Sequence, residues 1–362
     1  MIPTAAFASS TYLEQVLYVE PTPVGFFGAS LIHVFFWIWA HSWEHPGLMS
    51  FFYAALKRRK IFNGVIRDNF EGDPTVDLLG FKDEPQLAYF WNFSTSFHHA
   101  FGGIIMLCAW YFELPSLWRH GMLVEVAGYD FLDFCRMAYC KLTGDTSKPL
   151  PVSRVMSSDS PYSKLQIIHH SVGLTVGSAV IIYFSEIPEF QEFGWMMLGG
   201  PGLIGMPGLY FNTFPKNAWA VHTFDKFIQM VAWFHQRIWY FFPALYRLLS
   251  IAVSSDDVPI LPKVGFYWGA FALSLFNVIV MGACVSSFYG IVKSKNQSIQ
   301  RDGKRKRSRQ ITMTPTTFAA GALAELNQCP LQGEIALYAF SKTHVWARRA
   351  KENVARRKCR QQ

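Results

Sequence analysis

Hydrophobic residues gather in seven long stretches along the chain, separated by shorter segments rich in charged and turn-forming residues. Most stretches approach about 20 residues, the length of helix that crosses the roughly 30 Å hydrocarbon core of a bilayer. The pattern predicts an all-α protein, a polytopic bundle of about seven transmembrane helices. The predicted spans cover residues 24–43, 87–110, 121–140, 165–184, 193–211, 219–249 and 264–292.

The composition agrees with this class, because 51% of the residues are hydrophobic and only 16% are charged, against roughly 25% in soluble domains. The six cysteines show neither metal-type C-x-x-C spacing nor a disulfide framework, so free thiols are expected. The N-terminus lacks the pattern of a cleavable signal peptide, so the first span is expected to stay in place. We predict an N-terminal extramembrane segment (1–22), a transmembrane helix bundle (23–293) and a basic C-terminal tail (294–362).

The formal net charge of +8 is concentrated at the C-terminal end. Residues 291–362 hold 16 Lys and Arg against 4 Asp and Glu, a net charge of +12, so residues 1–290 carry −4. The basic residues therefore belong to a tail rather than to a nucleic-acid-binding surface, and no nucleic-acid partner is expected. The loops that would share a side with this tail are also basic, which places the C-terminus on the cytosolic or matrix side.

Several ionisable side chains fall inside apolar spans, where such groups are costly and usually functional. His98 and His99, the first histidine pair, lie near the middle of the second span, and Asp130 and Asp133 share one helical face of the third. His98 and Asp130 each lie about ten residues from the end of their span, so we predict that they face each other near the midplane. A histidine beside a carboxylate in a cavity of low dielectric can act as a general base. A buried polar cluster that fixes helix packing is the alternative.

The fourth and sixth spans supply further candidates for lining an internal cavity. His169 and His170 form a second histidine pair near the start of the fourth span. In the sixth span, His235 lies two residues before Arg237. A hydrogen-bonded packing role is the alternative for His235.

The fifth span is unusually rich in glycine and proline, at residues 199–202 and 207–208. These residue types predict an interrupted helix. Irregular backbone is tolerated in a membrane only against protein or a water-filled cavity. The segment therefore predicts either an internal cavity or close packing against a neighbour.

His41 and His45 have the i, i+4 spacing that places two imidazoles on one helix face, as a metal site requires. Pro46 follows directly and is expected to end the helix. The histidine boxes of di-iron enzymes need a further histidine three residues before each histidine pair. This chain has Thr95 and Gln166 at those positions. We therefore predict no bound metal.

Three short stretches resemble one family of membrane proteins. They are Phe97-His98-His99, the segment Arg-His-Gly-Met-Leu-Val at 119–124, and the Asp130-x-x-Asp133 pair. Together they resemble the Lag1 motif of the TLC-domain proteins, which include the ceramide synthases and TRAM. Residues 229–239 also resemble the final span of that domain, so the resemblance covers about 90–240.

The resemblance implies a multi-pass protein of the endoplasmic reticulum that handles long-chain acyl or sphingoid lipids. It implies that His98, His99, Asp130 and Asp133 catalyse an acyl-CoA-dependent N-acyl transfer. Acyl-CoA would be a co-substrate, and no bound cofactor is expected. In an alternative register, the second histidine pair stands at the family's double histidine.

A non-catalytic subunit of a large membrane complex is a different function class that also fits the sequence. The 17% aromatic content and the polar extensions at both ends favour such a subunit, for example in the mitochondrial inner membrane. A transporter is a third option because of the interrupted fifth span, although no inverted repeat is evident. The expected partners are membrane lipids, together with a second copy in a homodimer or the subunits of a complex.

Overall fold

The computed structural model describes residues 12, 14–42, 47–71, 76, 81, 83–144 and 161–305. Every regular element within this part of the chain is helical, which confirms the predicted all-α class. The candidate metal ligand His45, the loop at 145–160 and the tail from residue 306 onward lie outside the described residues.

Each of the seven predicted apolar stretches coincides with a helical run. Four of these runs contain a π-helical turn, labelled η, in which the backbone hydrogen bonds reach five residues along the chain. The runs are α2 (Pro23–Ala40); α6 (Gln86–Phe112); α7 (Pro115–Glu125), η2 (Val126–Phe131) and α8 (Leu132–Thr143); α10 (Pro161–Val172), η3 (Gly173–Gly177) and α11 (Ser178–Tyr183); α12 (Pro188–Gly194), η4 (Trp195–Gly199) and α13 (Gly200–Phe211); α14 (Trp219–Phe234), η5 (His235–Tyr240) and α15 (Phe241–Ser254); and α16 (Ile260–Arg305).

Local sequence signals account for several helix ends. Thr22 caps α2 because its hydroxyl oxygen accepts a hydrogen bond from the backbone N–H of Gly25 at 3.2 Å, and Pro23 follows at the start of the helix. α6 ends at Glu113, whose φ of 59° is the left-handed conformation that terminates a helix. Pro115 then begins α7, so only two residues separate these helices. α6 and α7 therefore form a tight helical hairpin.

Residues 62–86, between the first two predicted spans, are charged and rich in turn-forming residues, which predicts a loop, but the segment is partly helical. The segment forms η1 (Phe62–Ile66) and α4 (Arg67–Phe70), and the preceding helix α3 covers Leu48–Lys57. Phe62, Ile66 and Phe70 recur every four residues, so they form one apolar face despite the charged residues between them, and all three are buried. The prediction of a loop at 62–70 is therefore wrong. It followed the charged composition of the segment and did not take account of the helical spacing of its apolar residues.

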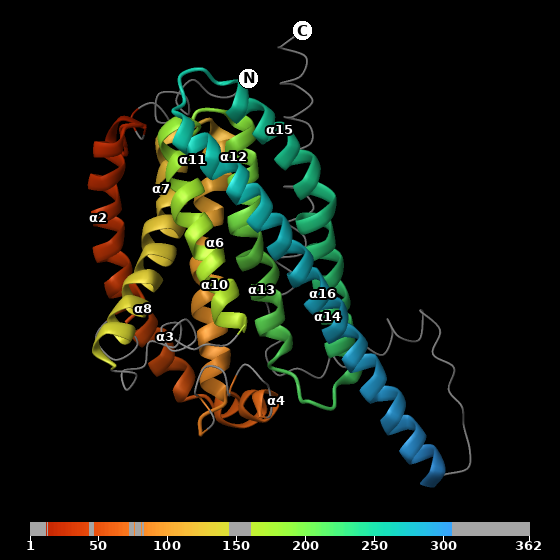
Figure 1. The fold of residues 1–362 in the computed structure, drawn as a ribbon. Helices are drawn as coiled ribbons and strands as arrows, with labels where there is room; N and C mark the ends of the chain where they lie inside the picture. The colour runs from red at the N-terminus through yellow and green to blue at the C-terminus, as the bar shows by residue number, and fades with distance from the viewer. Residues whose placement is uncertain are drawn as a thin grey trace, which may run out of the picture. The chain divides into compact units, whose positions relative to one another are not determined.

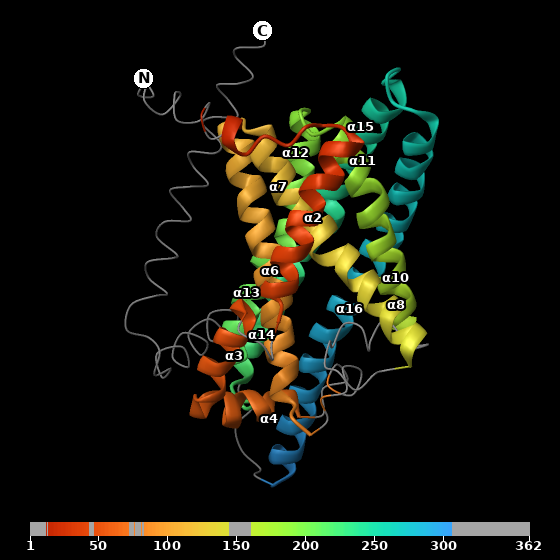
Figure 2. The same ribbon diagram turned by 90° about the vertical axis from the view of Figure 1, so that its left-hand side faces the viewer.

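Two described helices are long and apolar enough to cross a membrane by length and composition, namely residues 23–40 and 260–290. Little of either helix is buried inside the protein, and both present large apolar side chains outward, such as Phe35 and Phe271. In Figure 1, α2 lies at the periphery of the unit formed by residues 1–307, and Figures 1 and 2 show the C-terminal part of α16 extending beyond the other helices. Large exposed apolar faces mark contact with lipid or a partner. The other five spans remain a prediction.

Helix α6 packs against α7, η4 and α13 through glycines. A Cβ added to Gly102 would come within 3.2 Å of the Gly121 carbonyl oxygen of α7, and one added to Gly103 would overlap the Cα of Gly199. The Gly202 position likewise leaves no room for a side chain against Ala100. Small residues allow helix backbones to approach closely, as in membrane helix pairs. This packing holds the first histidine pair in place.

The predicted interruption of the fifth span is wrong, because residues 188–211 form one continuous helical run with Pro207 inside it. The glycines serve close packing, which was one of the two predicted outcomes. The side-chain amides of Gln236 and Gln229 occupy the space where a Cβ at Gly200 and Gly208 would stand. The π turn η4 absorbs the irregularity without breaking the helix.

Candidate functional site

The α6–α7 hairpin pairs His99 with Glu125. The Nδ1 atom of His99 lies 2.7 Å from a carboxylate oxygen of Glu125, and the Glu125 side chain is 3% exposed. The carboxylate accepts a hydrogen bond from Nδ1–H, which leaves Nε2 as the basic nitrogen of the neutral ring. The pair thus has the arrangement of a histidine base that is oriented by a carboxylate.

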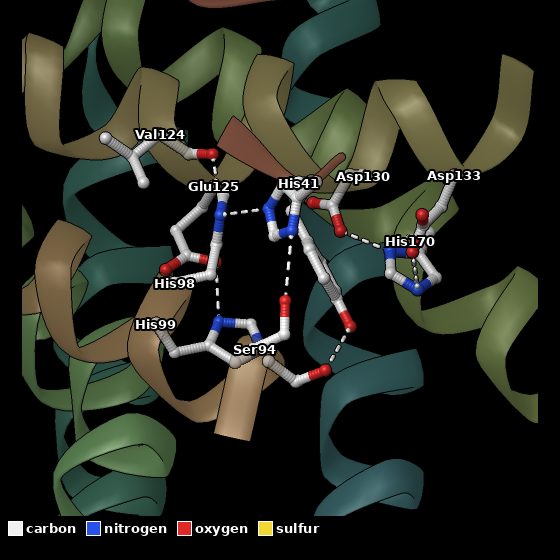
Figure 3. A network of polar contacts seen from close by, with 11 residues as sticks. His41, Ser94, His98, His99, Val124, Glu125, Asp130, Asp133 and His170 are labelled. Carbon is white, nitrogen blue, oxygen red and sulfur yellow. Dashed lines mark hydrogen bonds and ion pairs between the residues drawn. The ribbon is translucent and has the colours of Figure 1, made fainter. Parts of the chain in front are cut away.

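His98 makes different contacts from its neighbour and is fully buried. The carbonyl oxygen of Val124 can only accept a hydrogen bond, so the Nε2 of His98 donates to it at 2.8 Å. With neutral rings, His98 Nδ1 then accepts from His41 Nε2 at 2.9 Å, and His41 Nδ1 accepts from the Ser94 hydroxyl at 3.3 Å. Figure 3 shows this relay running from Ser94 through both rings to Val124. The relay ties α2 to α6 and α7, so its geometry is that of a packing network.

His170, from the second histidine pair, lies between the two aspartates. Its Nδ1 forms an ion pair and hydrogen bond with Asp130, and its Nε2 lies 3.7 Å from a carboxylate oxygen of Asp133 (Figure 3). All three side chains are buried. Gly173 makes the approach possible, because a Cβ at that position would overlap the Asp130 carboxylate. Residues 130, 133 and 170 therefore form one unit that joins η2 and α8 to α10.

Tyr129 connects the histidine pairs. Its ring centroid lies 4.9 Å from that of His98, 5.0 Å from His99 and 5.4 Å from His170. Its hydroxyl also donates a hydrogen bond to Thr95 Oγ1 at 3.4 Å. Tyr129 and Asp130 belong to the π turn η2, and both are buried although they are consecutive. π turns often occur at functional sites because they redirect side chains in this way.

The predicted partnership of His98 with Asp130 is therefore wrong. The structure instead joins His99 to Glu125 and Asp130 to His170. The prediction assumed a loop of about ten residues between the second and third spans, counted from their apolar ends. The actual link has two residues, which shifts the register of α7 along α6, and His98 lies against Val124 instead of Asp130.

A pocket opens beside this cluster, with an empty volume of about 790 Å³ that includes its mouth. Five ionisable residues line it: His99, Glu125, Asp130, His169 and Arg237. The remaining lining is almost entirely apolar, with residues such as Val126, Val176, Phe190, Met197 and Leu273. An adjoining apolar space of about 350 Å³ shares residues 176, 180, 190, 193 and 273 with the pocket and continues to Leu248 and Phe266. The two spaces together offer a polar region and a long apolar extension.

Of the other predicted cavity residues, some line the pocket and one does not. His169 and Arg237 line the pocket, whereas His235 is exposed. The prediction that His235 lines a cavity is therefore wrong, because η5 turns Gln236 and Arg237 inward in its place. The guanidinium of Arg237 donates from Nη1 to Asn277 Oδ1 at 3.2 Å and lies 5.0 Å from the ring centre of Trp233.

Sequence reasoning missed Glu125 as a partner of His99. The available signal was that Glu125 is a third carboxylate in a predicted span, alongside Asp130 and Asp133.

Within the described residues, no group of three or more His, Cys, Asp or Glu side chains is arranged to hold a metal ion.

No known protein family, characterised protein or solved structure matches this chain. The resemblance to TLC-domain proteins therefore rests on the residues quoted for it and remains a prediction.

Proposed function

We propose that this chain is an integral membrane protein of about seven spans that holds the acyl chain of a long-chain lipid in its pocket and acts on the lipid head with a His–carboxylate pair. The observation that carries the proposal is the composition of the pocket lining. Five ionisable residues line a cavity whose remaining lining is almost entirely apolar. An amphipathic ligand matches such a site because its tail is buried against apolar walls while its head meets the acid–base groups.

The proposed number of spans is supported by helix length. The shortest run, α2, has 18 residues, which corresponds to about 27 Å at 1.5 Å per residue. α6 has 27 residues and reaches about 40 Å. The buried side chains of His98, Glu125 and Asp130 within these runs are hydrogen-bonded or ion-paired, which compensates for their removal from water. We place the protein in the endoplasmic reticulum, as its resemblance to TLC-domain proteins implies, with the C-terminus on the cytosolic side.

The chemistry we propose is acyl transfer from acyl-CoA to the amine of a long-chain base. The amine nitrogen attacks the thioester carbonyl carbon, so that a C–N bond forms and the C–S bond breaks. His99 Nε2 takes the proton of the attacking amine and delivers it to the departing CoA sulfur. Glu125 orients the imidazole and stabilises its protonated form. In this proposal His98 and Asp133 support the site, and Asp130, which is paired with His170, adds a second carboxylate to the pocket lining.

The test uses the full chain in membranes that lack background activity, with labelled acyl-CoA and a sphingoid base. We expect His99→Ala to lower kcat by about 10²- to 10⁴-fold, the usual contribution of a general base. His235→Ala is the matched control, because it removes an exposed histidine. Full activity in His99→Ala, with normal amounts of folded protein, would refute the proposed base.

The alternative of a non-catalytic subunit draws support from the exposed apolar faces of α2 and α16, which partner helices could also cover. Mild extraction from the native membrane separates the two functions. A particle of one or two copies with retained lipid supports the enzyme. Migration with a fixed set of other subunits, for example from the mitochondrial inner membrane, supports the structural role.

A further inference from the structure

Arg237 is a buried charge without a counter-ion. Arg237 is 4% exposed, and no ion pair joins its guanidinium to a carboxylate anywhere in the described part of the chain. Its Nη1 donates to the neutral Asn277, and its Nε has no hydrogen-bond partner. Burying an unpaired charge is costly, and a guanidinium held in an apolar bundle is usually matched by an anion.

The two carboxylates of the pocket do not serve as that anion. Glu125 is joined to His99, and Asp130 is joined to His170. Each acid therefore contacts a histidine rather than Arg237, and the Arg237 guanidinium has no direct carboxylate partner among the described residues.

The residues that line the pocket include a second buried nitrogen without a hydrogen-bond partner. His169 lines the pocket with Arg237, and its Nδ1 makes no hydrogen bond. Its ring is stacked on Phe276, with centroids 4.4 Å apart and an interplanar angle of 11°, which fixes its orientation. Both side chains line the pocket, and each has one nitrogen without a hydrogen-bond partner.

The fold holds Arg237 in this position through several contacts. The π turn η5 buries Gln236 and Arg237 together, and Gly200 leaves the space that Gln236 occupies. The Arg237 guanidinium lies over Trp233, and Asn277 accepts from its Nη1. A planar fork fixed by stacking and by a hydrogen bond is suited to a carboxylate or phosphate.

We propose that Arg237, together with His169, binds the oxyanion head of a single-chain lipid whose tail occupies the pocket and the adjoining apolar space. The head is the carboxylate of a long-chain fatty acid or the phosphate of a long-chain monoester. This assignment rests on the proposed function, since it uses the same pocket. It adds that the pocket also takes a lipid with an anionic head, and that Arg237 and His169, which line the same pocket as His99 and Glu125, recognise that charge.

The experiment measures binding of three labelled probes to the purified full chain in neutral detergent. The probes are palmitate, palmityl alcohol and palmitoyl lysophosphatidate, which share a 16-carbon chain and differ in the head. Arg237→Gln removes the charge and Arg237→Lys keeps it. Arg247→Gln is the matched control, because Arg247 is an exposed arginine ten residues further along.

We expect the unmodified protein to bind an anionic probe about 10- to 100-fold more tightly than the alcohol, as a charge-assisted hydrogen bond contributes. Arg237→Gln should lose that preference and still bind the alcohol, whereas Arg247→Gln should retain the preference. The stronger of the two anionic probes identifies the head as carboxylate or phosphate.

Equal binding of all three probes by the unmodified protein would overturn the anionic assignment and leave the pocket intact. This comparison needs no variant, so it also decides the question if Arg237→Gln does not fold. Binding of none of the probes would instead refute the lipid pocket of the proposed function.

Discussion

The close contact of α6 with the fifth helical run provides a sharp test of the packing that positions the site. Gly103 of α6 faces Gly199 at the end of η4, and a Cβ on Gly103 would overlap the Gly199 Cα. The perturbation is Gly103→Ala, which adds a single methyl group. The control is Gly28→Ala in α2, where nothing lies within 4 Å of the added Cβ.

The size of the effect follows from the geometry. Carbon atoms in contact lie about 3.5–4.0 Å apart, so the two backbones must separate by more than about 1 Å to admit the methyl group. Overpacking of this kind costs roughly 1–3 kcal/mol. Replacing glycine by alanine in a helix contributes about 1 kcal/mol in the opposite direction, and it does so at both positions. The free energy of unfolding should therefore differ between the two variants by about 1–3 kcal/mol, with Gly103→Ala the less stable.

The assay is thermal unfolding of the two purified variants in the same detergent, followed by intrinsic tryptophan fluorescence. A difference of 1–3 kcal/mol corresponds to a difference in Tm of about 2–4 °C per kcal/mol. Because α6 also carries His99, we expect ligand binding in the pocket to weaken in Gly103→Ala alone. An equal Tm in both variants would contradict the close contact of the two backbones.

Three further predictions test the hydrogen bonds and the pocket. Arg119 is buried and donates hydrogen bonds to the Val19 carbonyl, Ser185 and the exposed Glu186. Arg119→Met should therefore lower the free energy of unfolding, measured by chemical denaturation, by about 2–4 kcal/mol, while Glu186→Gln should change it by less than about 1 kcal/mol. Similar losses in both variants would show that the exposed ion pair, and not the buried donors, carries the stability. Trp118→Phe keeps a ring in the core but removes the 3.1 Å hydrogen bond to the Gln191 carbonyl, so we expect a loss of about 1–2 kcal/mol in the same measurement, and an unchanged value would show that this bond does not contribute. Phe193 lines both the pocket and the adjoining apolar space, so Phe193→Ala should shift the bound lipids toward longer chains, by about fourfold in affinity for each additional buried methylene. Mass spectrometry of the lipids that copurify measures this shift, and an unchanged chain-length profile would place the tail elsewhere.

Much of the fold could be predicted because its signals are local. Each apolar stretch forms helix where the hydrophobic pattern predicted it, and Pro23 and Pro115 mark beginnings that the residue type alone explains. The segment 62–70 shows the limit of composition, since three aromatic or aliphatic residues at helical spacing outweighed its charges.

The candidate site was predicted in its residue types but not in its pairings. His99, Asp130, His169 and Arg237 all line the pocket. The partner of His99 depends on the two-residue turn between α6 and α7. The hydropathy pattern predicted a longer loop at this position. A change of a few residues in such a link moves every pair along the hairpin, because each residue adds 1.5 Å to its helix.

The sequence by itself determined the helical class, the positions of the helices and the placement of ionisable groups within apolar segments, because each of these depends on residues that are near in the chain. Only the tertiary structure decided that Asp130 meets His170, that Glu125 meets His99 and that Arg237 is left without a counter-ion. These outcomes depend on helix register and on close approach at glycines such as Gly173, which bring together residues that are far apart in the chain. Helix packing therefore decides that each acid meets a histidine while Arg237 has no counter-ion.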